Sequence, residues 1–384
     1  MQKQLILALI LMVSSVDVAQ VLYKYKQKTT HDLIVEHGYP AEHYKIETED
    51  GNMLAAFRIP FSHKLQNQNT KRPIVLLQHG LLSSSDVWVV SGPNDSLAFL
   101  LSDAGFDVWI GNNRGNEYSK ELKKPSWNFS FHEIGYYDLA ALIDFALKTS
   151  GQEQKSLHYV GHSQGTTVYF TLMSLRPEYN AKIKTAHMLA PVAIMKNIHN
   201  ECITCAANLI PVNGWMARYF SHKEFGKIIG SRSFSLCFDK ECKNVLEKLS
   251  SEHSNKTALI ESAKISQTGS WKQIFHFLFN YKSGNFQQFD YDTVRNLEVY
   301  KAEKPPKYPI EKITSEVHLW YIDNDELVPV DDVIALADRL PKKVLHHIEH
   351  PLWAHSDYYL HNEIRKYLNE PIIKIMRQYE LDTK

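Results

Sequence analysis

The chain has 384 residues and a formal net charge of zero, because 43 Lys and Arg residues balance 43 Asp and Glu residues. A chain of this length can bury a large core in one α/β domain or in two domains. The balanced charge provides no global basic field that would attract nucleic acid or an anionic membrane surface, so the composition argues against a nucleic-acid partner.

The first residues have the layout of a cleavable signal peptide. Lys3 precedes an apolar run at residues 5–13, and small residues follow. The run is shorter than the roughly 18 apolar residues that span a bilayer, which disfavours the alternative of a short membrane anchor, and no later segment is long enough. We therefore predict that residues 1–19 are removed and that the protein is secreted, with a lysosome-like compartment as the alternative destination.

Alternating patterns then predict an α/β protein. Residues 43–60 read as two strands around the turn Glu49-Asp50-Gly51-Asn52. Short apolar runs predict buried strands at 74–77, 106–110, 157–160, 185–189 and 317–322, and a last strand is expected near 343–349. Helical spacing appears at 96–104, 138–148 and 166–175, and a final helix is expected from Glu363. Strands that alternate with helices favour a mainly parallel sheet with helices on both faces.

The alternation lapses between residues 195 and 301, where aromatic-rich helical pieces such as 271–280 occur. We interpret this segment as an inserted cap, which divides the core into residues 20–194 and 302–384. The cap contains all four cysteines. Cys202 and Cys205 form a CxxC pair, but no second CxxC or His pair lies at ligand spacing, so a structural role is favoured over a zinc or redox site. Cys237 and Cys242 are the favoured disulfide, across a short loop.

Three Asn-x-Ser/Thr triplets are candidate glycosylation sites and agree with secretion. They begin at Asn94, Asn128 and Asn255.

The strongest motif is Gly161-His162-Ser163-Gln164-Gly165, which lies between a predicted strand and a predicted helix. This is the arrangement of a nucleophile elbow, in which a serine on a strained turn exposes its hydroxyl above the sheet. The flanking glycines allow the close backbone approach that such a turn needs. The placement disfavours the alternative of an ordinary glycine-rich turn with a capping serine. We predict that Ser163 is a catalytic nucleophile.

A serine nucleophile needs a general base and an acid that orients the base, in the chain order Ser, Asp or Glu, His for this fold. Asp323 and Asp325 both follow the strand at 317–322. Asp331 and Asp332 are expected to cap a helix instead. Asp325 is favoured because it lies two residues further from the strand than Asp323 and is freer to reach an imidazole.

The base is sought among the histidines near the carboxyl end of the chain. His346 and His347 fall inside the last predicted strand, and His350 lies at its end. His355 lies in a loop before the final helix, where an imidazole is free to reach Ser163. We therefore predict His355 as the base.

Acyl transfer also requires donors for the tetrahedral oxyanion, usually two backbone N–H groups. One is expected from Gln164, the residue after the nucleophile. The second is expected from Leu81, because His79-Gly80 follows the strand at 74–77. The alternative for His79-Gly80 is a plain strand-ending turn.

A set of further motifs covers nearly the whole chain beyond the leader. They are Glu36-His-Gly-Tyr-Pro40, Thr48-Glu-Asp-Gly51, Leu77-Gln-His-Gly-Leu-Leu82, Gly105-Phe-Asp-Val-Trp-Ile-Gly-Asn112, Arg114-Gly-Asn116, Tyr137-Asp-Leu139, Leu157-His-Tyr-Val-Gly-His-Ser-Gln-Gly-Thr-Thr167, Ala190-Pro-Val192, Lys282-Ser-Gly284 and Asn324-Asp325. With these motifs the chain resembles the acid lipase family, which includes gastric and lysosomal acid lipases, and it is most similar to insect members.

The resemblance implies an α/β-hydrolase fold with an inserted helical cap, and hydrolysis of triacylglycerols and sometimes steryl esters at a lipid–water interface, without metal or cofactor. It assigns Ser163, His355 and Asp325 to the triad and Leu81 and Gln164 to the oxyanion hole.

The chain departs from the family pattern at His132-Glu133, at Asp323-Asn324, and at residues 267–270 of a shortened cap. Because the cap determines substrate preference, a carboxylesterase or a steryl-ester hydrolase is the alternative enzyme. A non-catalytic lipid-binding protein is disfavoured because the candidate triad is present.

Overall fold

The computed structural model describes residues 28–120, 127–151, 153–200, 203–204, 207–208, 224–225, 250–258 and 268–383. The predicted signal peptide and the four cysteines, including the expected Cys237–Cys242 pair, lie outside these residues. Among the described residues, no helix is long and apolar enough to cross a membrane.

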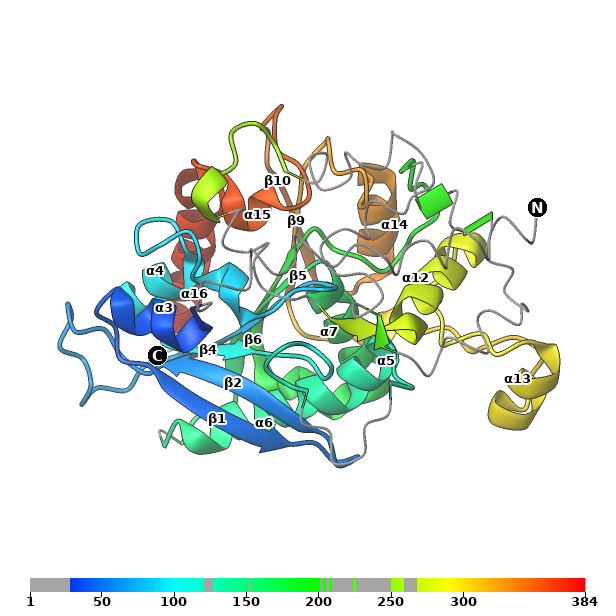
Figure 1. The fold of residues 1–384 in the computed structure, drawn as a ribbon, viewed down its shortest axis with the longest axis horizontal. Helices are drawn as coiled ribbons and strands as arrows, with labels where there is room; N and C mark the ends of the chain where they lie inside the picture. The colour runs from blue at the N-terminus through cyan, green and yellow to red at the C-terminus, as the bar shows by residue number, and fades with distance from the viewer. Residues whose placement is uncertain are drawn as a thin grey trace, which may run out of the picture.

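The core is an eight-stranded sheet in the order β1-β2-β4-β3-β5-β6-β9-β10 (Figure 1). β2 pairs antiparallel with β1 and with β4, and every other pairing in this sheet is parallel. The predicted α/β-hydrolase architecture with a mainly parallel sheet is therefore confirmed. The strands are β1 (Glu42–Glu47), β2 (Met53–Ile59), β3 (Ile74–Gln78), β4 (Asp107–Gly111), β5 (Leu157–His162), β6 (Ile183–Leu189), β9 (Val317–Tyr321) and β10 (Lys343–His347).

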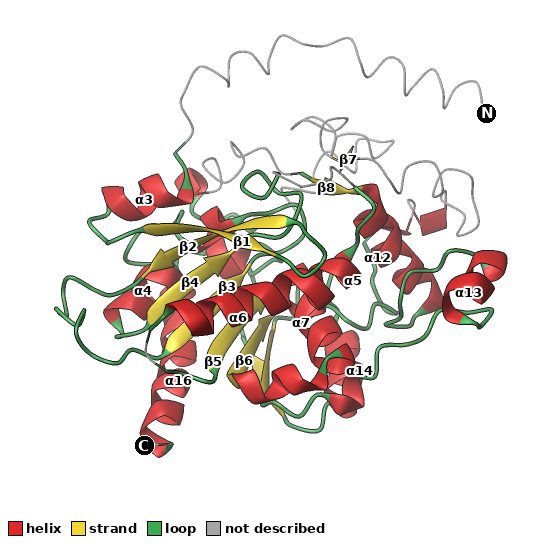
Figure 2. Ribbon diagram, turned by 90° about the horizontal axis from the view of Figure 1, so that it is seen from below, coloured by secondary structure: helices red, strands yellow, loops and turns green. Residues whose placement is uncertain are grey.

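Helices cover both faces of the sheet, and Figure 2 shows α6 in front of the strands. α4 and α16 pack against β4 and β6, whereas α6 and α7 pack against β3 and β5. The α-helices are α3 (Thr30–Glu36), α4 (Leu97–Asp103), α5 (Phe131–Glu133), α6 (Ala140–Thr149), α7 (Gln164–Leu175), α12 (Trp271–Ser283), α13 (Thr293–Tyr300), α14 (Val330–Arg339), α15 (Asp357–Leu360) and α16 (Glu370–Asp382).

Burial explains why the apolar runs identified the strands. Every residue of β3, β4 and β5 is buried, as expected for parallel strands that are covered on both faces. The edge strand β10 is mostly exposed. Helix α3 was not predicted, although it carries a capping box in which Thr29 and Asp32 each accept from the other's backbone N–H. Its seven residues are too few for a periodic signal.

A buried arginine connects three of the sequence motifs, at residues 48–51, 114–116 and 137–139. The Arg114 guanidinium contacts the carboxylate of Asp138 at 2.6 Å and that of Asp50 at 2.7 Å. Arg114 and Asp138 are both buried. Removing one partner would leave an uncompensated buried charge, so this network holds the turn of the β1–β2 hairpin to the helical layer.

The described part of the predicted cap contains a small sheet, formed by β7 (Glu224–Phe225) and β8 (Gly269–Ser270), and helices α12 and α13. α13 lies at the periphery of the molecule (Figure 1). α12 carries a hydrophobic cluster separate from the main core, formed by Ala207, Phe275, Leu278, Phe279 and Phe289.

Candidate active site

Ser163 lies on the sharp turn between β5 and α7. Its backbone has φ 52° and ψ −119°, a region that non-glycine residues rarely adopt. Its N–H donates to the Leu189 carbonyl at 3.0 Å, and its own carbonyl accepts the Thr166 N–H at 2.9 Å. The neighbouring strand and the first turn of α7 thus hold a strained conformation of the kind expected for a nucleophile elbow.

The two glycines of the motif are required by close packing. A Cβ built on Gly161 would lie 2.7 Å from the Gly165 carbonyl carbon, and one built on Gly165 would lie 2.4 Å from the Gln78 carbonyl oxygen. Both separations are shorter than real Cβ contacts. α7 therefore packs directly on the end of β3, which brings the loop after β3 beside Ser163.

Asp325 and His355 form a buried ion-pair geometry. His355 Nδ1 lies 2.8 Å from Asp325 Oδ2, and the two side chains are 8% and 2% exposed. The other carboxylate oxygen accepts the backbone N–H groups of Leu327 and Val328 at 2.9 and 3.2 Å. The turn after β9 therefore fixes the carboxylate, and the carboxylate in turn orients the imidazole so that Nε2 faces away from it.

Residues around His355 tie its loop to the elbow. His162, the residue before Ser163, donates from Nε2 to the His355 carbonyl at 2.9 Å. Burial lowers the pKa of His162 well below its ordinary value, so this ring is neutral. Asp357 accepts the Ala354 N–H at 2.8 Å. Sequence reasoning missed the roles of His162 and Asp357, although both stand within two residues of a predicted site residue.

The alternative acid is in a different environment. Asp323 Oδ1 lies 2.9 Å from His347 Nε2, and the side chains are 62% and 34% exposed. Asp331 and Asp332 both lie in the first turn of α14, where they were expected to cap the helix, but the Asp332 carboxylate is bound elsewhere. It accepts two hydrogen bonds from Asn197, from the backbone N–H at 2.9 Å and from the side-chain amide at 2.8 Å.

The two predicted oxyanion donors belong to segments that adjoin the serine. A Cβ on Gly80 would lie 3.2 Å from the Ser163 Cβ, so the loop after β3 contacts the elbow. Among the described residues, neither the Leu81 N–H nor the Gln164 N–H donates a hydrogen bond. Two N–H groups without a protein partner in segments next to a serine can receive a developing negative charge.

His79 orients the first of these donors. Its Nε2 accepts the Asn113 N–H at 3.2 Å, so the hydrogen is on Nδ1, which donates to the Gly80 carbonyl at 2.8 Å. Burial lowers the pKa of His79 to about 4, which keeps the ring neutral. Because C=O and N–H are antiparallel in a trans peptide, fixing the Gly80 carbonyl also fixes the Leu81 N–H.

One cluster among the described residues offers metal-ligand atoms, namely His350, His361 and Glu363, whose ligand atoms lie within 4.8 Å of one another. His361 Nδ1 accepts the Glu363 N–H at 3.1 Å, so its neutral ring carries the hydrogen on Nε2. A ligating histidine instead donates from its second nitrogen, and binding at Nε2 would break this contact. We assign no metal to the cluster.

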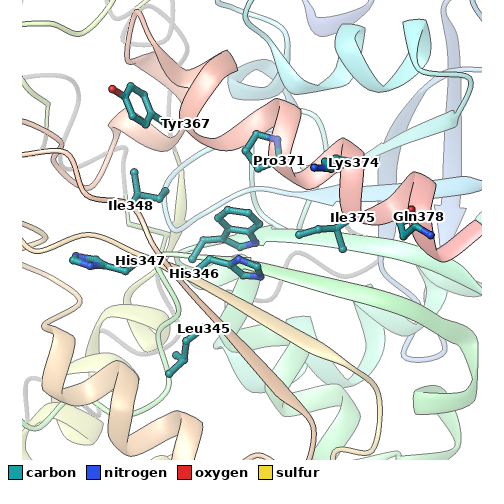
Figure 3. A pocket seen from close by; sticks show the side chains of 10 residues that line it. Leu345, His346, His347, Ile348, Tyr367, Pro371, Lys374, Ile375 and Gln378 are labelled. Carbon is teal, nitrogen blue, oxygen red and sulfur yellow. The ribbon is translucent and has the colours of Figure 1, made fainter.

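An open groove of about 590 Å³ lies between β10 and α16 (Figure 3). Trp320 is among its lining residues, and Figure 3 shows His346 of β10 on the side facing Ile375 of α16. None of the three candidate triad residues lines this groove, so it is not the candidate active site.

Two of the three glycosylation triplets are on the surface. Asn94 and Asn128 are exposed. Asn255 is half-buried, and its side chain accepts the Ala258 N–H at 3.0 Å.

Comparison with known proteins defines the class. The family model described as "alpha/beta hydrolase fold" matches residues 73–361, and the "Partial alpha/beta-hydrolase lipase region" matches residues 30–92. A soluble variant of the monoglyceride lipase of Saccharomyces cerevisiae has the same fold, with a TM-score of 0.56 and 16% identity over 93% of this chain and 98% of that chain. The protein is an α/β-hydrolase.

The particular family follows from two curated relatives. Lipase 3 of Drosophila melanogaster is 38% identical over 366 residues, which cover 90% of this chain and 92% of that protein. Gastric triacylglycerol lipase of Homo sapiens is 36% identical over 341 residues and 85% of each chain. The chain belongs to the acid lipase family and is a carboxylic ester hydrolase.

Proposed function

We propose that the protein is a secreted serine lipase that hydrolyses neutral-lipid esters of the triacylglycerol type, with Ser163, His355 and Asp325 as its triad. The observation that carries the proposal is the buried Asp325–His355 pair, whose histidine is hydrogen-bonded through its carbonyl to the residue before the strained Ser163. An imidazole oriented in this way can remove the serine proton, and the carboxylate stabilises the imidazolium that forms.

The reaction then proceeds by acyl transfer in two steps. Ser163 Oγ attacks the ester carbonyl while His355 takes its proton, and the carbonyl oxygen becomes an oxyanion between the Leu81 and Gln164 N–H groups. Collapse of the tetrahedral intermediate expels the alcohol, which receives the proton from His355, and leaves Ser163 acylated. Water activated by His355 then releases the fatty acid. No step requires a metal or a cofactor.

Residues 195–301 are proposed to cap an apolar acyl site. The relatives named triacylglycerol lipases support a glycerol ester of fatty acids as the substrate. The aromatic side chains of α12 support a cap that excludes water and contacts lipid tails at a lipid–water interface.

Secretion is proposed from the layout of residues 1–19, with a lysosome-like compartment as the alternative. The exposed Asn94 and Asn128 are then the favoured sites of N-glycosylation, and Cys237–Cys242 is the favoured disulfide. Replacing each asparagine with glutamine should remove one glycan from the secreted protein, as measured by the electrophoretic mobility before and after glycosidase treatment.

The function is tested by rates on a panel of esters, namely p-nitrophenyl butyrate, tributyrin, triolein and cholesteryl oleate, with Ser163→Ala as the control. Faster turnover of emulsified triolein than of the soluble ester supports a lipase. Activity restricted to the soluble ester would make the protein a carboxylesterase, and a preference for cholesteryl oleate would make it a steryl-ester hydrolase. An absence of any activity that depends on Ser163 would contradict the proposal.

A further inference from the structure

Strand β8 and the first turn of α12 contact the two segments that carry the proposed oxyanion donors. Gln273 Nε2 donates to Gln164 Oε1 at 3.0 Å. On the other side, a Cβ built on Gly269 would lie 3.2 Å from Leu82 Cδ2. Leu82 follows the donor residue Leu81 and has a strained backbone with φ 52°. Residues 269–273, which form β8 and the first turn of α12, therefore pack on both donor segments.

The orientation of the Gln273 amide is determined by its partners. Its Oε1 accepts the Ser270 N–H at 2.8 Å, and a backbone N–H can only donate. Nε2 is therefore the group that faces Gln164. Ser270 Oγ in turn accepts the Gln273 N–H at 3.2 Å, which completes a capping box at the start of α12.

The turn is anchored to the core independently of the elbow. The Thr268 hydroxyl donates to the Gly115 carbonyl, and the Ser270 hydroxyl donates to the Phe129 carbonyl. All four groups lie in buried surroundings. The Gln273 amide is therefore carried on a turn whose position does not depend on Gln164.

We infer that Gln273 is a positioning residue for the oxyanion hole, acting through the side chain of Gln164. The inference rests on the proposed function, and it adds a determinant supplied by α12 to the donors supplied by the core. Gln164 and Gln273 are only 2% and 3% exposed, so no bulk water replaces their hydrogen bond. Because oxyanion donors act within about 2.7–3.1 Å, a small rotation of the Gln164 peptide weakens stabilisation of the transition state.

The experiment compares Gln273→Met with a matched variant, Ile274→Ala, in the full-length secreted protein. Methionine keeps the length of the side chain and removes both of its hydrogen bonds, to Gln164 and from the Ser270 N–H. Ile274 is the next residue of α12 and packs against the second hydrophobic cluster, so its truncation loosens the helix without touching Gln164. The concentration of competent sites is measured first, by titration with a fluorophosphonate, so that kcat is expressed per competent site.

For Gln273→Met we expect kcat on p-nitrophenyl butyrate to fall by about 10- to 100-fold per titrated site, with KM nearly unchanged. Inhibition by a boronic acid, whose tetrahedral adduct places an oxygen in the hole, should weaken by a similar factor. Ile274→Ala should lower the fraction of competent sites at most. Gln164→Met keeps the backbone N–H and should lose a similar factor, and the double variant should lose no more than either single variant.

A kcat within twofold of wild type for Gln273→Met would overturn the inference, as would an unchanged boronate affinity or additive losses in the double variant. Wild-type and Ser163→Ala proteins are assayed in parallel. If wild type hydrolyses the ester and Ser163→Ala does not, these results bear on Gln273 alone. If the two proteins behave alike, the proposed function fails and the inference fails with it.

Discussion

Two aspartate–histidine pairs lie near the carboxyl ends of β9 and β10. In the first, His355 Nδ1 is 2.8 Å from Asp325, and in the second, His347 Nε2 is 2.9 Å from Asp323. The first pair is almost completely buried, with side chains 8% and 2% exposed, whereas the side chains of the second are 34% and 62% exposed. Nearly equal distances therefore occur in very different environments.

The difference shows that a short contact alone does not define a catalytic pair. Water screens the exposed pair, and such pairs contribute about 0–1 kcal/mol to stability. The buried pair is screened much less. Only the buried pair is also connected to the elbow, through the bond between His162 and the His355 carbonyl. Four predictions test this contrast, from the largest expected effect to the smallest.

The largest effect is expected at Ser163, because the buried pair and not the exposed pair would remove its proton. Ser163→Ala should lower kcat for ester hydrolysis by about 10⁶-fold, since loss of the nucleophile alone costs about this much in a serine protease. The fold should be retained, because the small side chain contributes little buried area. Circular dichroism and the initial rate on tributyrin measure the two outcomes. If the folded variant kept near wild-type turnover, Ser163 would not be the nucleophile, and the buried pair would have no catalytic role to compare with the exposed pair.

The next prediction separates the two aspartates. Asp325→Asn should lower kcat by about 10⁴-fold, because the amide no longer stabilises the imidazolium or holds the correct tautomer. Asp323→Asn should change kcat by less than about twofold, since its partner is exposed and lies outside the site. The same assay, run on purified protein with matched melting curves, ranks the variants. The opposite ranking would transfer the acid role to Asp323.

A third prediction concerns His346, whose ring faces another histidine. Its Nε2 lies 2.9 Å from His318 Nδ1, and burial, with a contribution from His318, lowers the pKa of His346 to about 4. As the pH falls below the unfolded value near 6.5, the unfolded chain binds the proton first. The free energy of unfolding should therefore decrease between pH 6.5 and about 4, and this group should have no effect above that range.

Urea denaturation at half-unit steps of pH measures this slope. His346→Gln, which keeps a neutral polar group, should reduce the slope by less than one proton per molecule. His63→Gln, at an exposed position in the loop after β2, is the matched control for replacing a histidine with glutamine. Equal slopes for wild type and His346→Gln would contradict the prediction.

The smallest effect is expected for the stability of the exposed pair. His347→Ala should change the free energy of unfolding by less than about 1 kcal/mol at pH 6, and 0.5 M salt should remove most of that difference. Urea midpoints at low and high salt provide the measurement. A loss of several kcal/mol would mean that the two pairs are not as different as their exposure indicates.

The sequence predicted the elements and the candidate residues well where the signal is local. The apolar runs identified five of the six strands in the parallel part of the sheet, because buried strands need continuous apolar stretches. The elbow was recognised because glycines at 161 and 165 are required by backbone packing between neighbouring segments. Chain order and loop position reduced the candidate acids to Asp323 and Asp325. They also selected His355 as the base among the later histidines.

Tertiary structure alone decided which aspartate is buried against which histidine. Asp325 and His355 are separated by 30 residues, and the contact of His162 with His355 spans 193. The contact between Gln164 and Gln273 spans 109 residues and has no sequence signature. Periodicity and turn chemistry are local properties of the chain, whereas burial and the approach of distant side chains depend on how all layers pack, so only the folded molecule determines them.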